Sequence, residues 1–489
     1  MLLAASVIVL LAILAVRATS WIGLPSLLIY LAMGIVLGES VLGVRFDDPK
    51  TAHALGFAAL VVILAEGGLT TQWSEVRPSL GLGLALATVG VAVSVCVVAL
   101  VCHLALSLPW ETSLLLGAIT SPTDAAAVFA VLRRVPLRPS LLGALEAESG
   151  LNDAPTVLLV VLISSGRGPD DGLLRFAGLV AYELAGGVVG GVLIGVAGVW
   201  MLRRVALPAS GLYPITVIAI AVLSYSGMAA LHASGFAAVY VTALWMGSSE
   251  LPHRTSTRSF AEGLAWLAQI GLFIMLGLLV SPSTITLKHV VGGVVVGGVL
   301  MLVARPVSVV VCASPLRLSW PEQAFLSLAG LRGAVPIVLA TIPLAERVAR
   351  SGDVFNVVFV LVVVLTVFTA PALPALANML GVTVERARDV DVEAAPLERI
   401  AADLLQVKIT DQSKLHGVEV GELRLPPGAS VSLIVRGSSS FTPDRRTSLK
   451  HGDDLLIVTP RGDRDATERR LQAVSRGGRL AMWRHRDAD

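Results

Sequence analysis

Charged residues are scarce in this chain of 489 residues, since Asp, Glu, Lys and Arg make up only 15% of it. Soluble proteins carry about 25% charged residues, so the composition excludes an ordinary cytosolic enzyme. Cysteine is also rare: the three residues lie in or beside apolar runs without CxxC spacing, which excludes a secreted disulfide scaffold. The net charge of +2 gives no sign of a nucleic-acid partner, and we expect none.

Apolar residues are abundant instead, at 55% of the chain with a mean hydropathy of +0.80. The charges are concentrated at the end, because 35 of the 72 lie in residues 385–489. We therefore predict an all-α polytopic membrane domain of about 13 transmembrane helices over residues 1–381. The predicted spans are 2–16, 21–38, 53–70, 80–106, 111–132, 141–164, 174–201, 212–230, 232–248, 260–280, 287–312, 320–342 and 354–380.

Lysine and arginine in the short loops predict the orientation in the plasma membrane. With the N-terminus outside, eleven basic residues fall in inner loops and seven in outer loops. The inner set is Arg17, Arg77, Arg133, Arg134, Arg138, Arg203, Arg204, Arg254, Arg258, Arg305 and Arg317. An odd number of spans then places the C-terminal tail in the cytoplasm.

The segment after the last predicted span is polar. Residues 382–400 are acidic, without long apolar runs, and are predicted to be a linker. Short alternating segments follow within 401–461, separated by turn signals such as Pro426-Pro427-Gly428, and they predict a small α+β domain. Residues 462–489 are strongly charged, and we interpret them as a solvated extension.

Ionisable residues inside apolar runs cost about 2.5–3.5 kcal/mol each on insertion scales, and they are usually functional. In this chain they cluster, and the set is Glu66, Asp124, Glu146, Glu148, Asp153 and Arg332. Several buried acids against one buried base cannot all form internal ion pairs. The surplus acids must hold protons, bind an external cation, or do both.

Helical spacing sorts the acids of the sixth predicted span. Ser149 and Asp153 are four residues apart, so they share one face that can present oxygens to an ion. Glu148 lies on a neighbouring face. It is the natural partner of Arg332, because a buried guanidinium needs a carboxylate.

Two of the predicted spans contain helix breakers. Pro122 interrupts the fifth span, and Gly330, Gly333 and Pro336 weaken the twelfth. Unwound backbone at membrane depth is tolerated only where it lines a cavity. Interrupted helices at corresponding positions of two halves indicate a transporter site built from inverted repeats.

Four motifs resemble those of the NhaP-type monovalent cation/proton antiporters, the bacterial relatives of the animal sodium/proton exchangers. They are EGGL at 66–69, TSPTDAAAVF at 120–129, ESGLND at 148–153 and GLRGAVP at 330–336. The resemblance implies thirteen spans with crossed broken helices, a homodimer, and no cofactor beyond the transported ions. The implied activity is exchange of a monovalent cation for a proton by alternating access.

The resemblance also implies roles for single residues. Asp153 takes up the proton or the cation in turn, and Glu148 forms a structural ion pair with Arg332. The transported metal ion is held by Asp153, Asp124 and Ser149. The full set implied to bind the cation or the proton is Asp153, Asp124, Thr123, Ser149, Asn152 and Glu66.

The tail at 401–461 resembles the C-terminal half of the regulator-of-potassium-conductance module. The resemblance rests on GELRLP at 421–426 and TSLKHGDDL at 447–455. Together with Asp-Ala-Ala-Ala at 124–127, this tail resembles the potassium/proton branch of the family. It implies a regulatory small molecule such as a nucleotide, although the tail has no GxGxxG motif.

Two alternatives stay open at this stage. A sodium/proton antiporter would share the whole fold and the same site. A potassium channel with a regulatory tail would need a filter similar to TVGYG. The nearest stretch is Thr88-Val89-Gly90-Val91, which lies in mid-helix and lacks the Tyr-Gly.

The resemblance also implies electroneutral exchange, because Asn152 stands where electrogenic relatives have a second Asp. We expect the rate of cation-driven proton flux to be independent of voltage when vesicles are clamped at different membrane potentials. A rate that changes with voltage would contradict one-for-one exchange.

Overall fold

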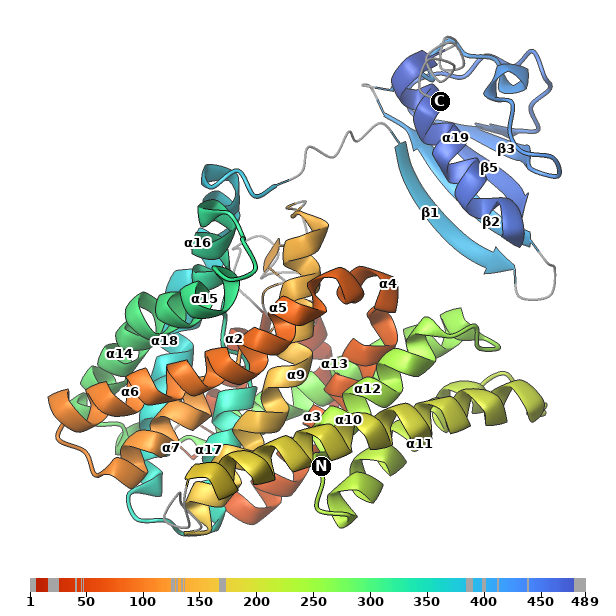
Figure 1. The fold of residues 1–489 in the computed structure, drawn as a ribbon. Coiled ribbons are helices and arrows are strands. Elements are labelled where there is room, and N and C mark those ends of the chain that lie inside the picture. Colours follow the sequence, from red (N-terminus) through yellow and green to blue (C-terminus); the bar gives the residue numbers. More distant parts are fainter. Residues whose placement is uncertain are drawn as a thin grey trace. The chain divides into compact units, whose positions relative to one another are not determined.

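The computed structural model describes residues 6–15, 26–39, 42–44, 46, 48–124, 128, 131–132, 135, 137–166, 173–383, 390–397, 402–410, 413–437 and 439–478. The chain divides into two compact units, Met1–Val384 and Glu385–Asp489. Figure 1 draws the first as an assembly of helices and the second as a sheet with a helix, α19. Each unit has its own hydrophobic core.

The first unit is helical. Its helices are Ser6–Ala15, α2 (Ser26–Leu37), α3 (Pro49–Thr70), α4 (Trp73–Val76), η1 (Arg77–Ser79), α5 (Leu80–Ala85), η2 (Leu86–Gly90), α6 (Val91–Ala105), α7 (Trp110–Thr120), α9 (Pro139–Ser164), α10 (Leu173–Arg204), α11 (Leu212–Ala230), α12 (Gly235–Ser248), α13 (Arg254–Leu279), η4 (Pro282–Thr284), α14 (Leu287–Val299), η5 (Leu300–Ala304), α15 (Arg305–Ala313), α16 (Trp320–Leu328), α17 (Val335–Ala345) and α18 (Ser351–Met379).

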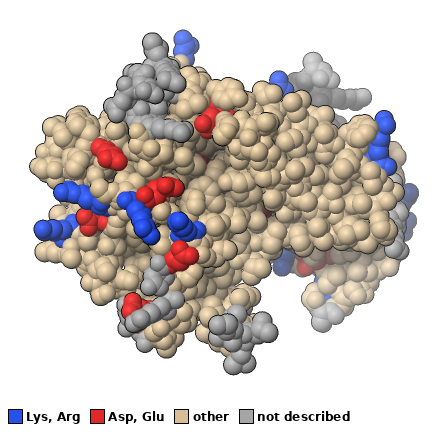
Figure 2. Space-filling view, turned by 90° about the horizontal axis from the view of Figure 1, so that it is seen from below, with Lys and Arg blue, Asp and Glu red and all other residues tan. Residues whose placement is uncertain are grey.

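The predicted helical membrane domain is confirmed. Within the described residues, seven helices are long and apolar enough to cross a membrane, and four shorter apolar helices accompany them. The total of thirteen stays a prediction. Seen from below the view of Figure 1, most of the surface is uncharged, and acidic and basic side chains gather on one part of it (Figure 2). Further charged side chains lie near the edges of this view, and the broad area between them is uncharged, as expected where side chains face lipid.

The same order of elements occurs twice in the first unit. A helix with a π-helical segment comes first, as α5–η2–α6 and again as α14–η5–α15. A broken helix follows: α7 ends at Thr120 before non-helical backbone at 121–124, and α16 ends at Leu328 before non-helical backbone at 329–334. A long helix with an internal proline comes third, as α9 and α18. This duplication agrees with the repeats predicted from the two breaks.

Glycine brings neighbouring helices into close contact with α9. A Cβ added at Gly83 of α5 would overlap Ala147 of α9, and a Cβ at Gly150 of α9 would overlap the ring of Tyr240 in α12. Small residues let helices approach closely in a bilayer, where dispersion contacts and not water drive packing. The helix that carries most of the predicted site is therefore held firmly by α5 and α12.

The second unit is a five-stranded antiparallel sheet in the order β1-β2-β5-β3-β4. Alternate residues of β2 and β5, including Leu405, Val407 and Leu455, are fully buried, as the alternating sequence predicts. The elements are β1 (Val390–Leu397), β2 (Ala402–Ile409), η6 (Val420–Leu423), β3 (Ser430–Arg436), β4 (Ser439–Phe441), β5 (Asp453–Pro460), η7 (Arg461–Asp463) and α19 (Arg464–Gly477).

The tail boundaries differ from those predicted. The predicted linker at 382–400 contains β1, whose sequence alternates valine with acidic residues and pairs along its length with β2. The predicted solvated extension at 462–489 contains α19. Leu471 and Val474 of this helix are buried in the core of the sheet domain, so the helix is part of the domain.

Asp453 is a buried charge in the tail. Its carboxylate is inaccessible to solvent and accepts hydrogen bonds from Nε and Nη2 of Arg436, each at 2.8 Å. The backbone N–H of Lys450 donates a third, at 2.8 Å. Burial alone raises the pKa of this carboxyl, but the hydrogen bonds and the charge of Arg436 outweigh burial and hold the pKa below its usual range.

The tail should therefore lose stability in acid. A lowered folded-state pKa contributes stability above the unfolded-state pKa of about 3.9, and this contribution is lost as the pH falls through the folded-state pKa. Asp453→Asn should lower the free energy of unfolding of the tail at neutral pH by on the order of 2 kcal/mol and abolish this acid dependence. Hydrogen exchange of the β5 amides in the full-length protein, corrected for intrinsic rates, measures both effects.

The adjacent, half-buried Asp454 offers a matched control for this substitution. Asp454→Asn should leave exchange at β5 close to that of the unmodified protein. Equal effects of the two substitutions would contradict a special role for Asp453.

Candidate functional site

The two broken helices cross one another in the first unit. The backbone N–H of Asp124 donates to the carbonyl oxygen of Leu331 at 2.9 Å, which joins the two non-helical segments directly. Arg332 donates from Nε to the carbonyl of Thr120 at 3.2 Å and from Nη2 to that of Ser121 at 3.4 Å. Each break leaves backbone groups without helical partners, and the other break supplies partners for several of them.

Glycine is required where the breaks meet. A Cβ added at Gly333 would overlap Oδ2 of Asp124, so the carboxylate occupies the space that any larger residue would fill. The carbonyl of Arg332 is held by the hydroxyl of Thr366 in α18, at 3.2 Å. The crossing therefore fixes the position of Asp124 by sterics as well as by hydrogen bonds.

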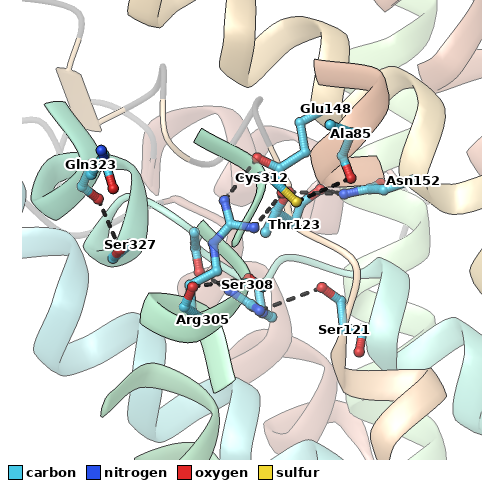
Figure 3. Close-up of polar contacts among 12 residues, drawn as sticks. Ala85, Ser121, Thr123, Glu148, Asn152, Arg305, Ser308, Cys312, Gln323 and Ser327 are labelled. Atoms are coloured by element: carbon cyan, nitrogen blue, oxygen red, sulfur yellow. Dashed lines mark hydrogen bonds and ion pairs between the residues drawn. The ribbon is translucent and has the colours of Figure 1, made fainter. Parts of the chain in front are cut away.

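A buried ion pair lies beside the crossing (Figure 3). Nη1 and Nη2 of Arg305 donate to the two carboxylate oxygens of Glu148 at 2.5 and 2.7 Å, and both side chains are almost fully buried. The hydroxyl of Thr123 donates to Oε1 of Glu148 at 3.1 Å. Asn152 then donates from Nδ2 to the same hydroxyl at 2.8 Å. This chain of contacts ties α15, α9 and the first break together.

The structure corrects the predicted pair of Glu148 with Arg332. The guanidinium of Arg332 donates hydrogen bonds to the backbone carbonyls at the breaks, including that of Gly330. In the described part of the chain, Arg332 forms no ion pair with Glu148. The partner of Glu148 is Arg305, which was predicted to lie in an inner loop. Arg305 is only 3% exposed.

Two π-helical segments position Arg305. The segment η5 (Leu300–Ala304) ends directly before this residue, and it packs on α6, while α15 packs on η2. The thiol of Cys312 in α15 donates to the carbonyl of Ala85, the residue before η2, at 3.3 Å (Figure 3). A π-helical turn disturbs the regular hydrogen bonding of the helix and is frequent at functional sites. The sequence signal for Arg305 was an arginine inside the apolar run 290–312, which holds no other charged residue.

Asp153 has no basic partner in the part of the chain that the structure describes. It is 5% exposed, and neither its Oδ1 nor Oδ1 of the adjacent Asn152 has a hydrogen-bond partner. The carboxylate of Asp124 is near enough to repel it. Buried polar atoms are normally satisfied, so these oxygens are suited to a ligand that supplies positive charge.

The other predicted residues are placed less closely together. Ser149 is half-buried and lies one turn before Asp153 on α9. Glu66 lies on α3, half-buried, and the acid that faces it is Glu262 of α13. The implied part of Glu66 in binding the cation or the proton stays a prediction.

The donor set around Asp153 suits a monovalent cation. The described residues hold no group of three or more His, Cys, Asp or Glu side chains that could bind a metal ion. The oxygens near Asp153 instead include the carboxylate of Asp124 and the unpaired amide Oδ1 of the adjacent Asn152. Oxygen ligands of low total charge suit a weakly held, transported ion better than a resident metal.

The chain is similar to known exchangers over almost its whole length. Residues 6–378 match the transmembrane sodium/hydrogen exchanger family, and residues 404–472 match the TrkA-C domain. The K(+)/H(+) antiporter NhaP of Alkalimonas amylolytica is 33% identical over 94% of this chain and 80% of its own length. The K(+)/H(+) antiporter NhaP2 of Shewanella baltica is 30% identical over 94% and 79%.

Solved structures support the same fold. The sodium proton antiporter MjNhaP1 from Methanocaldococcus jannaschii superposes with a TM-score of 0.64 at 21% identity, covering 77% of this chain and 97% of that chain.

A further relative by sequence, the probable Na(+)/H(+) antiporter 2 of the same organism, is 25% identical over 66% of this chain and 80% of its own length.

A double-mutant cycle tests the corrected ion pair. Arg305→Met leaves Glu148 buried and unpaired, so the free energy of unfolding should fall by about 3–5 kcal/mol. The same substitution should be much less harmful in a Glu148→Gln background. Thermal unfolding of the purified protein in detergent measures both. Arg332→Met is the control, and stronger coupling of Glu148 to Arg332 than to Arg305 would contradict the pair.

Proposed function

Because this chain belongs to the sodium/hydrogen exchanger family, we propose that it exchanges potassium ions for protons across the plasma membrane by alternating access. The family consists of transporters, so the chain is not an enzyme. The observation that carries the proposal is a buried Asp153 carboxylate without a basic partner in the described part of the chain, beside two crossed helix breaks.

The charges around Asp153 explain why it is suited to exchange. Arg305 is fully engaged by Glu148, and Arg332 is engaged by backbone carbonyls. Neither is available to neutralise Asp153. A carboxylate removed from water is unstable when bare, so it is stable only with a proton or a cation bound. If only these two forms pass through the closed state, each proton that crosses is matched by a cation crossing in the opposite direction.

The remaining site residues have supporting roles in this proposal. Thr123 and Asp124 contribute oxygens from the first break, and Ser149 adds a hydroxyl on the face of α9 that carries Asp153. Asn152, held by Thr123 at 2.8 Å, orients its free Oδ1 beside the carboxylate. Glu66 reaches the ion through water from α3.

Potassium is favoured as the transported cation by two lines of support. The relatives that are at least 30% identical are named K(+)/H(+) antiporters, and the tail matches the TrkA-C domain. Sodium is the second candidate, because the solved relative is a sodium proton antiporter. The family assignment disfavours the channel alternative.

The orientation and assembly are part of the same proposal. The N-terminus lies outside and the tail inside; with Arg305 removed from the loops, the count becomes ten inner against seven outer basic residues. The protein is a homodimer in the lipid bilayer. A small molecule such as a nucleotide regulates it through the tail.

Cation-driven proton flux in everted vesicles tests the proposal. Potassium, sodium, rubidium and lithium are added in turn, and potassium should give the largest flux at the lowest concentration. Asp153→Asn should reduce the flux to that of empty vesicles, because the neutral amide can bind neither ion. Asp353→Asn is the control, since this acid is exposed at the start of α18. Undiminished exchange by Asp153→Asn would refute the proposal.

A further inference from the structure

Three elements of the first unit meet at the side chain of Arg138, immediately before α9. Its Nη1 donates to Oε1 of Glu322 in α16 at 3.2 Å, and its Nη2 donates to the carbonyl of Gly381 at 3.2 Å. Its backbone N–H donates to the carbonyl of Val382 at 3.2 Å. We call this set of contacts, formed by Arg138, Glu322 and residues 381–383, the Arg138 clasp.

The clasp includes the end of α18. Gly381, with a φ of +63°, donates to Asn378, and Val382 donates to Ala377, which closes the helix in a Schellman motif. Val382 is fully buried, and Thr383 forms an antiparallel bridge with Leu137. The chain leaves the first unit at the next residue. The segment that leads to the tail is thus bonded to the start of α9.

Two helices, α9 and α16, connect the clasp to the two parts of the transport site. Glu148 lies ten residues after Arg138 on α9, about 15 Å along the helix, and Asp153 lies little more than one turn further. Glu322 caps α16 through Ser319. That helix runs directly into the second break with Gly330 and Arg332. A displacement of residues 381–383 would therefore move the starts of both helices.

We propose that Arg138 is the positioning residue through which the tail controls the transport site. The inference rests on the proposed function, since the quantity it controls is cation/proton exchange. Residues 381–383 carry a change in the tail to Arg138, and Arg138 passes it to α9 and α16 together. The contacts are suited to this use because Arg138 is partly exposed and forms one ion pair with the residues that the structure describes. A pair of this kind is weak enough to open.

Three full-length proteins test the proposal by cation-driven proton flux. One has about ten Gly-Ser residues inserted after Val384, which form a flexible spacer; one is Arg138→Gln; one has both changes. Each single change should shift the half-activating potassium concentration by on the order of tenfold, within the usual range of allosteric coupling. The combination should shift it no further, because both changes interrupt one connection. A merely structural role of Arg138 would make the effects add.

A matched control and a second variant keep this test decisive. Arg317→Gln changes an exposed arginine shortly before α16 whose side chain makes no hydrogen bond or ion pair in the described part of the chain, and it should have no effect. Glu322→Gln should give part of the Arg138→Gln effect. A spacer without effect, or additive shifts, would overturn the proposal.

Hydrogen exchange separates this proposal from the proposed function. If the full-length protein exchanges no cation for protons, the proposed function fails, and the clasp is judged by amide exchange alone. Arg138→Gln should raise exchange at the amides of Arg138 and of the first turn of α9, relative to Arg317→Gln. Unchanged exchange at these amides would overturn the clasp.

Discussion

A charge buried in a membrane must be neutralised, and this constraint organises the first unit. Arg305 neutralises Glu148 through two short hydrogen bonds. The charge of Arg332 is stabilised by hydrogen bonds to uncharged backbone carbonyl groups of the first break. Neither arginine forms an ion pair with Asp153 in the described part of the chain. Asp153 can therefore bind a proton or a cation because both buried arginines already have other partners.

The helix breaks and the buried arginine depend on each other. Non-helical backbone inside a membrane exposes carbonyl groups that need donors, and a guanidinium offers five donors that need acceptors. Arg332 and the carbonyls of Thr120 and Ser121 satisfy this double requirement. Gly333 leaves room for Asp124 at the same point. The half-buried Asp124 is thus positioned by non-helical backbone and not by a helix.

The sequence was sufficient for the features that depend on local pattern. Apolar runs predicted a helical membrane domain, Pro122 and Gly330 predicted the breaks, and the four-residue spacing placed Ser149 near Asp153. The partner of Glu148 was not predictable in this way, because choosing between two arginines requires the three-dimensional packing of α9 on α15. Arg305 was misplaced because counting basic residues to assign loops cannot distinguish an arginine in water from one inside a span. Leu471 and Val474 were missed because their apolar spacing is short and lies among many charges.

The π-helical segments limit how many residues the helices that contain them can gain or lose. Each contains an extra residue relative to a regular α-helix, and every residue after it is rotated by about 100° as a result. Removing one residue from Leu300–Ala304 would restore regular winding and turn Arg305 away from Glu148. The extra residue therefore sets the rotation that points Arg305 toward Glu148. Homologous chains that keep this ion pair should conserve the number of residues in this helix more strictly than its side chains.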